Sequence, residues 1–303
     1  MLAAVFVEKE KILIKEVDYP QCDRGGLILK VKACGICGSD VRNFRMGLRY
    51  GITSQIMGHE IAGVVEEVGP ECCRFRKGEA IAVAPDVSCG DCYYCKRGMV
   101  NLCLNHRMIG TNWPGGFAQY LHLPAEVLKQ GIMHPIPSGL SFQAAALSEP
   151  LASVIAAQAR AGIGVGDTVA IYGDGPVGCL HLEVARARGA AQVVLVGLKR
   201  LKAAQIFQPD LLIDAALQDP VAEIVSLTGG IGADVAIIAN PQAATQEQGL
   251  ESVRKRGKVI FFGGVAKDNP YTRLNSNLIH YNELLVFGVF SYPGYMHEKA
   301  LLV

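Results

Sequence analysis

The spacing of apolar residues changes about halfway along the chain. Up to about residue 150, short runs rich in Val and Ile alternate with Gly and Pro, which is typical of an irregular β domain. These runs are 27–31, 61–68, 80–84 and 118–123. From about Ala152 onward, strand-like apolar runs alternate with helical patterns, which predicts a doubly wound α/β domain around a parallel sheet. Its six expected strands are 168–172, 193–196, 211–213, 234–239, 258–262 and 284–289.

This change of pattern predicts a domain boundary near residue 150. A chain of 303 residues also exceeds the usual size of one hydrophobic core. We therefore assign residues 1–150 to the β domain and residues 151–290 to the α/β domain. Residues 291–303 are expected to start a return to the first domain, and this return is expected to be truncated.

Composition narrows the classes of function. Hydrophobic residues make up 50% of the chain, charged residues make up 19%, and the formal net charge is +1. This balance favours a globular protein with a small-molecule ligand, and gives no electrostatic reason to bind nucleic acid or a membrane. The N-terminus lacks the basic start of a signal peptide, and the apolar region 142–161 is interrupted by Glu149 and Arg160. We therefore expect a cytoplasmic protein.

Four of the ten cysteines lie close together in the sequence. Cys89, Cys92, Cys95 and Cys103 are separated by two, two and seven residues, in a segment with little apolar periodicity. Four thiolates at this spacing can surround one Zn²⁺ tetrahedrally, and such a closed site leaves no position for a substrate. A redox dithiol would need only two of them. The spacing therefore predicts a structural zinc site.

A second metal site is indicated by residues that lie far apart in the sequence. A catalytic zinc ion needs a few protein ligands and one open position. The candidate ligands are Cys37, His59, Glu60 and Glu149. Each of them alone is more often a packed residue or part of a turn, so the prediction depends on their combination.

A glycine-rich turn follows the first expected strand of the α/β domain. The segment Gly173-Asp-Gly-Pro-Val-Gly178 lies between the strand 168–172 and a helical stretch, 177–188. In this setting the glycines permit a tight turn, close approach of a pyrophosphate and packing of helix on strand. The motif predicts a dinucleotide site formed by Gly173, Gly175, Pro176, Val177 and Gly178. Gly263 and Gly264, which follow the strand 258–262, are expected to pass close to the nicotinamide half.

The next strand departs from the usual pattern for NAD. An acid at its end would bind the ribose hydroxyls, but position 197 is Gly, and Lys199 and Arg200 follow soon after. Without that carboxylate a 2′-phosphate meets no repulsion, and two cations are near enough to bind it, so the sequence favours NADP. In the alternative interpretation, Lys199 and Arg200 simply begin a solvated helix.

In their order along nearly the whole chain, these motifs resemble the zinc-containing medium-chain dehydrogenases of the alcohol dehydrogenase superfamily. The similarity is greatest to the sorbitol, threonine and polyol dehydrogenase branch. The motifs that carry it are Cys37-Gly-Ser-Asp40, Gly58-His-Glu60, the four-cysteine loop, Gly115-Gly-Phe-Ala118, Ser148-Glu-Pro-Leu151 and the glycine-rich turn. The resemblance implies a GroES-like catalytic domain followed by a Rossmann domain with a six-stranded, doubly wound parallel sheet.

The resemblance also implies roles for individual residues. Cys37 and His59 would bind the catalytic zinc, and Glu60 or Glu149 would supply the carboxylate, directly or through the bound water. Ser39 would begin a proton relay from the substrate. Asp40 would orient His59.

The activity implied is transfer of a hydride between NAD(P) and a secondary alcohol, expected to be a polyol, cyclitol or sugar-derived hydroxyl. A threonine-type amino-alcohol dehydrogenase is one alternative, and a non-catalytic zinc- and nucleotide-binding protein is another, because the C-terminus is short. A zinc-independent reductase is disfavoured because Cys37, His59 and Glu60 are all present. The resemblance also implies a homodimer or homotetramer.

Overall fold

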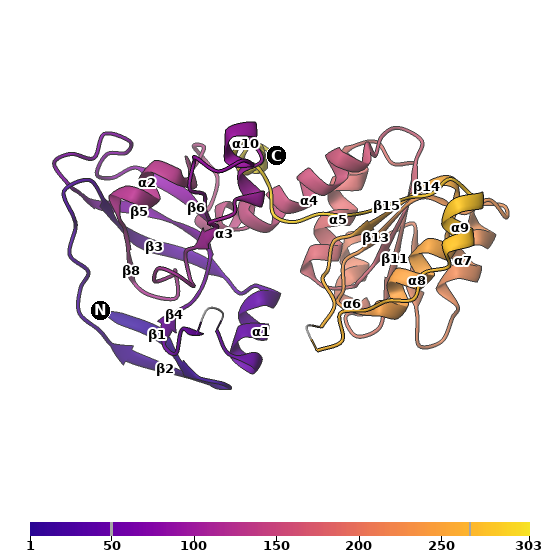
Figure 1. Ribbon diagram of the computed structural model, residues 1–303, viewed down its shortest axis with the longest axis horizontal. Coiled ribbons are helices and arrows are strands. Elements are labelled where there is room, and N and C mark those ends of the chain that lie inside the picture. Colours follow the sequence, from indigo (N-terminus) through magenta and orange to yellow (C-terminus); the bar gives the residue numbers. More distant parts are fainter. Residues whose placement is uncertain (49–50, 267) are drawn as a thin grey trace. The chain divides into compact units, whose positions relative to one another are not determined.

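The computed structural model describes residues 1–48, 51–266 and 268–303, which form two compact units (Figure 1). The first unit contains Met1–Ala152 together with Tyr292–Val303, and the second contains Ser153–Ser291. Both ends of the chain thus belong to the first unit. Among the described residues, no helix is both long enough and apolar enough to cross a bilayer.

The first unit is built from β-strands, as the sequence predicts, and these strands pair in the antiparallel direction. Its larger sheet has the order β7-β6-β5-β3-β8, and β9 pairs with β6. These strands are β3 (Leu27–Gly35), β5 (Glu60–Val68), β6 (Ala80–Val87), β7 (Arg107–Met108), β8 (Tyr120–Leu123) and β9 (Gly131–Pro135). A separate sheet of order β2-β1-β4 contains β1 (Leu2–Glu8), β2 (Lys11–Glu16) and β4 (Gln55–Ile56).

Alternate residues of these strands form the core of the first unit. Leu27 and Leu29 of β3 pack with Ile61 and Val65 of β5, as expected for strands with one buried face. The helices of this unit are α1 (Gly38–Met46), α2 (Ala125–Gln130), α3 (Phe142–Ala146) and α10 (Gly294–Leu301). Leu301 of α10 joins a smaller cluster of alanines from β5, β6 and α3, so this helix packs against elements that lie far earlier in the sequence.

The second unit contains one six-stranded sheet in which every neighbouring pair is parallel. Its order is β12-β11-β10-β13-β14-β15, with β10 (Thr168–Tyr172), β11 (Gln192–Gly197), β12 (Leu211–Asp214), β13 (Ala233–Ile238), β14 (Val253–Phe261) and β15 (Leu285–Gly288). All six expected strands are confirmed, although β14 begins five residues earlier than its apolar run. Because the strand order reverses beside β10, the carboxyl ends of β10 and β13 border the crevice in which such sheets bind ligands.

Helices cover both faces of this sheet (Figure 1). They are α4 (Ser148–Ala161), which begins in the first unit, α5 (Pro176–Ala187), α6 (Leu201–Ala204), α7 (Pro220–Leu227), α8 (Ala243–Glu251) and α9 (Ser276–Tyr281). Ile171 of β10 packs toward Leu182 of α5, whereas its neighbour Tyr172 packs toward Leu250 of α8. This alternation explains why the strands of the sheet are apolar at almost every position.

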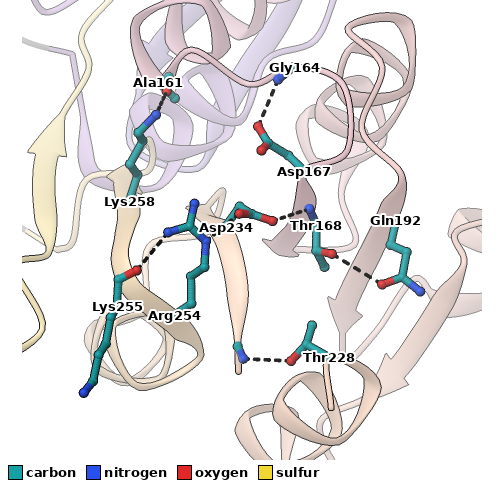
Figure 2. Close-up of polar contacts among 11 residues, drawn as sticks. Ala161, Gly164, Asp167, Thr168, Gln192, Thr228, Asp234, Arg254, Lys255 and Lys258 are labelled. Atoms are coloured by element: carbon teal, nitrogen blue, oxygen red, sulfur yellow. Dashed lines mark hydrogen bonds and ion pairs between the residues drawn. The ribbon is translucent and has the colours of Figure 1, made fainter. Parts of the chain in front are cut away.

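Polar side chains join the amino ends of the strands (Figure 2). Asp234 accepts hydrogen bonds from the backbone N–H of Thr168, at 2.7 Å, and from Nε of Arg254, at 2.6 Å. Lys258 donates a hydrogen bond to the carbonyl of Ala161 at the end of α4, at 2.6 Å. These contacts fix one edge of the sheet, and the glycine-rich turn lies at the opposite, carboxyl edge.

Candidate active site

The four clustered cysteines converge in the loop between β6 and β7. Their sulfur atoms all lie within 4.8 Å of one another. The backbone N–H of Cys89 points at Sγ of Cys103, at 3.2 Å, and the pKa of the Cys92 thiol is lowered to about 6, chiefly by backbone N–H groups. Sulfurs gathered in this way, with amide donors directed at them, fit a tetrahedral Zn²⁺ ion.

The second metal-ligand set is brought together by the pairing of β3 with β5. Gly35 at the end of β3 lies opposite Glu60 at the start of β5, so Cys37, two residues further on, reaches His59 and Glu60. The ligand atoms of Cys37, His59 and Glu60 lie within 4.8 Å of one another. A residue without a Cβ is required here for Glu60 to keep its position, because a Cβ on Gly35 would lie 1.9 Å from Oε2 of Glu60 and would displace that carboxylate. The sequence did not reveal this requirement.

Asp40 holds two of these residues in place. Its Oδ2 accepts a hydrogen bond from the backbone N–H of Cys37, at 2.9 Å, and its Oδ1 lies 3.4 Å from Nδ1 of His59. The other ring nitrogen of His59, Nε2, lies 3.4 Å from Oγ of Ser39. Asp40 is 4% exposed, so these contacts are formed away from bulk solvent. Ser39 and Asp40 thus lie next to different ring nitrogens of His59.

The electrostatics of this cluster favour a bound cation. Burial raises the pKa of Glu60, and the nearby Asp40 raises it further, whereas His59 lowers it. Burial lowers the pKa of His59, but Asp40, Cys37 and Glu149 raise it well above its ordinary value. Several anionic groups thus share one buried space. A divalent ion in that space would relieve their repulsion and replace the proton on His59.

Glu149 lies in the first turn of α4, outside the converging set. Its Oε1 accepts a hydrogen bond from the hydroxyl of Tyr292, at 3.0 Å. Burial raises the pKa of Glu149 to about 7, although the nearby His59 lowers it. The sequence left the choice of carboxylate open, and the geometry favours Glu60 as the third ligand. Tyr292 was not among the predicted site residues, because it lies 143 positions away from Glu149 in the chain.

The glycine-rich turn has the conformation that its sequence predicts. Gly173 has a φ of +139°, and a Cβ on Gly178 would lie 1.8 Å from the carbonyl oxygen of Gly173. Gly175 precedes α5, with Pro176 and Val177 as its first residues, and the nearest atom to a Cβ at Gly175 would be Nη1 of Arg200, at 3.7 Å. The start of this 12-residue helix is therefore open to an anionic ligand and fits the pyrophosphate of a dinucleotide.

Two further predicted cofactor segments lie at the same edge of the sheet. Gly263 follows β14 and passes so close to Asn240 that a Cβ would lie 2.5 Å from its carbonyl oxygen, whereas Gly264 has open space beside it. Lys199 and Arg200 are exposed and directly precede the short helix α6. Both interpretations of this cationic pair, phosphate ligand and solvated helix start, are compatible with these positions.

The sequence matches two family models. Residues 23–138 match the alcohol dehydrogenase GroES-like domain, and residues 176–302 match the zinc-binding dehydrogenase domain. Sorbitol dehydrogenase from Bacillus subtilis (strain 168) is 35% identical over 300 residues, covering 97% of this chain and 83% of the relative.

Solved structures show the same architecture. A putative zinc-binding dehydrogenase from Sinorhizobium meliloti 1021, bound to NADP, superposes with a TM-score of 0.91 at 33% identity, covering 99% of this chain and 86% of the other. A protein described as a short chain alcohol dehydrogenase from Escherichia coli CFT073, in complex with NADH, superposes with a TM-score of 0.87 at 26% identity, covering 99% and 86%. The predicted GroES-like domain and Rossmann sheet are thereby confirmed.

Proposed function

Because this chain belongs to the zinc-dependent, NAD(P)-dependent dehydrogenases of the alcohol dehydrogenase superfamily, we propose that it oxidises a secondary hydroxyl of a polyol, cyclitol or sugar-derived alcohol. The observation that carries this proposal is the convergence of Cys37, His59 and Glu60. These three residues would hold the catalytic zinc and leave a position open for substrate, while the four-cysteine loop would hold the structural zinc. The similarity to a sorbitol dehydrogenase supports the substrate class.

The residues around the metal-ligand set have distinct parts in the proposed reaction. A zinc ion held there would lower the pKa of the substrate hydroxyl, and NAD(P) would accept the hydride. Ser39, whose Oγ lies 3.4 Å from Nε2 of His59, would accept the proton of the substrate hydroxyl at Oγ while its own hydroxyl proton passes toward solvent. Asp40 keeps the imidazole of His59 oriented through Nδ1 and so fixes Nε2 as the ligand atom.

The proposed cofactor is NAD or NADP, and the sequence taken alone favours NADP. The absence of an acid at position 197 and the presence of Lys199 and Arg200 support it. One structural feature disfavours NADP, namely the carboxylate of Asp174, which lies against Gly197.

A homodimer or homotetramer remains a prediction from the family resemblance.

The proposal is tested by assaying purified protein with a panel of sorbitol, other polyols, cyclitols, sugar acids and L-threonine, each with NAD and with NADP. Zinc content is measured on the same sample. We expect two zinc ions per chain and chelator-sensitive reduction of the cofactor by at least one polyol or cyclitol. Turnover of threonine alone would assign the amino-alcohol class instead. Nucleotide and zinc binding with no turnover on any substrate would indicate a non-catalytic protein.

A further inference from the structure

A negative charge lies at the end of β11, although the sequence of that strand does not provide one. In Rossmann folds this strand end carries the acid that binds the adenosine ribose hydroxyls, and here it is the buried Gly197. A Cβ on Gly197 would lie 2.5 Å from Cβ of Asp174 and 2.7 Å from its Oδ2. Asp174 comes from the glycine-rich turn after β10. Its side chain therefore fills the space that an acidic side chain at position 197 would need.

The carboxylate of Asp174 is held by three consecutive backbone amides. Its Oδ2 accepts hydrogen bonds from the N–H groups of Leu198, Lys199 and Arg200, at 3.0, 2.8 and 2.5 Å. Burial raises the pKa of Asp174, but these three amides lower it more strongly, so the pKa lies below its ordinary value. Consecutive amides that point at one spot form an anion-binding nest, and in this protein the nest is filled by a carboxylate of the chain itself.

The position of Asp174 weakens the argument for NADP that rests on Gly197, Lys199 and Arg200. The preference for NADP inferred from the sequence assumes that no negative charge lies at the end of β11. A 2′-phosphate at this end would meet the ionised Asp174 and would find the amides of residues 198–200 already bonded. The side chains of Lys199 and Arg200 can act on the phosphate fully only when the carboxylate is absent or neutral.

We propose that Asp174 is a cofactor-specificity residue that replaces the acid missing at position 197 and discriminates against the 2′-phosphate of NADP. The inference rests on the proposed NAD(P)-dependent function. It predicts that the wild-type protein binds the adenosine half of NAD more tightly than that of NADP.

The test uses Asp174→Asn, which removes the charge but retains an oxygen that can accept the amide hydrogen bonds. Binding of 5′-AMP and of 2′,5′-ADP is measured by calorimetry, because these probes differ at the 2′-phosphate and require no turnover. In Asp174→Asn, the affinity for 2′,5′-ADP relative to 5′-AMP should rise by about tenfold or more. Adding Lys199→Ala or Arg200→Ala to this variant should reverse part of the gain.

Asp210→Asn is the matched control. The carboxylate of Asp210 also accepts a backbone hydrogen bond, from Val193 at 2.7 Å, but at the amino end of β11. The substitution removes one carboxylate charge beside the opposite end of β11, and the ratio of the two affinities should stay at the wild-type value.

Three results would contradict the proposal. The first is an unchanged ratio in a folded Asp174→Asn protein, which would leave Asp174 as a turn-stabilising residue only. The second is tighter binding of 2′,5′-ADP than of 5′-AMP by the wild-type protein, which decides the matter even if the variant does not fold. The third is the absence of binding of either probe to the wild-type protein, which would overturn the proposed function and this inference with it.

Discussion

The hydroxyl of Tyr292 donates a hydrogen bond to Oε1 of Glu149, at 3.0 Å. Tyr292 is 1% exposed, so water cannot readily replace it as a donor. This contact ties the segment before α10 to the first turn of α4. It also favours the ionised form of Glu149, whose pKa is raised to about 7 chiefly by burial and lowered in part by Tyr292.

Tyr292→Phe should therefore destabilise the protein more at high pH than at low pH. Above the pKa of Glu149 the substitution leaves a buried carboxylate without a donor, which costs about 1.5–3 kcal/mol, whereas a neutral acid loses about 0.5–1.5 kcal/mol. Urea unfolding of zinc-free protein at pH 5.5 and pH 8.5 measures the difference. Tyr271→Phe, at an exposed tyrosine, is the control. Equal losses at both pH values would show that Tyr292 stabilises the fold without acting on Glu149.

Asp40→Asn should weaken binding of the catalytic zinc about 10- to 100-fold, because Asp40 orients His59 and anchors the backbone of Cys37. Competition with a fluorescent zinc chelator measures the affinity, and the zinc held by the four cysteines should be unaffected. Asp167→Asn serves as a control, because that carboxylate accepts a backbone hydrogen bond from Gly164 in the other unit. Wild-type zinc affinity in Asp40→Asn would contradict the orienting role.

Single substitutions should affect the catalytic and the structural zinc site independently. His59→Ala should lose one of two zinc ions and nearly all turnover while keeping a wild-type circular dichroism spectrum. Cys92→Ser should also lose one zinc ion, but its main effect should be a lower melting temperature, because the closed site holds only a loop. Metal analysis, turnover and thermal melting are measured on each variant. Normal turnover by His59→Ala would refute the assignment of the catalytic metal.

His181 should make the protein sensitive to mild acid. It is fully buried in α5, and burial lowers its pKa to about 3, compared with 6.5 in an unfolded chain. Below pH 6.5 the unfolded chain binds a proton that the folded protein does not. The contribution of His181 to the free energy of unfolding is therefore fully present above pH 6.5. Below that pH the free energy of unfolding falls by about 1.4 kcal/mol per pH unit.

Urea unfolding between pH 7.5 and pH 5.0 measures this slope. His181→Gln removes the titrating group and should make this slope shallower by about 1.4 kcal/mol per pH unit. Part of the acid sensitivity should remain, because the pKa of His297 is also lowered to about 3. His280→Gln, at an exposed histidine, should leave the slope unchanged. A wild-type slope in His181→Gln would show that the burial of His181 is not what makes the protein acid-sensitive.

Local patterns predicted much of the fold. The strand 168–172 was predicted residue for residue, because a short apolar run ending at a glycine-rich turn has few other ways to fold. The four-cysteine loop was also predictable, because its ligands lie within 15 positions of one another and their spacing alone fits one zinc ion.

Features that depend on strand pairing and chain crossing were not predictable in the same way. The choice between Glu60 and Glu149 depends on the register of β3 against β5 and on Tyr292, which arrives from the far end of the chain. Likewise, the glycine at position 197 predicted that no negative charge lies at the end of β11. The parallel pairing of β10 with β11 nevertheless brings the carboxylate of Asp174 beside Gly197. In both cases the sequence does not show which segments lie side by side in the folded chain.

The segment Tyr292–Val303 has a consequence for biosynthesis. Since a ribosome releases the chain from its N-terminus, the Rossmann unit emerges complete while the first unit still lacks Tyr292 and α10. Until those residues emerge, Glu149 has no tyrosine donor and the alanine cluster under Leu301 is uncovered. The nucleotide-binding part is therefore free to fold first, whereas the metal-binding part can pack fully around Glu149 and the alanine cluster only after Tyr292–Val303 have emerged.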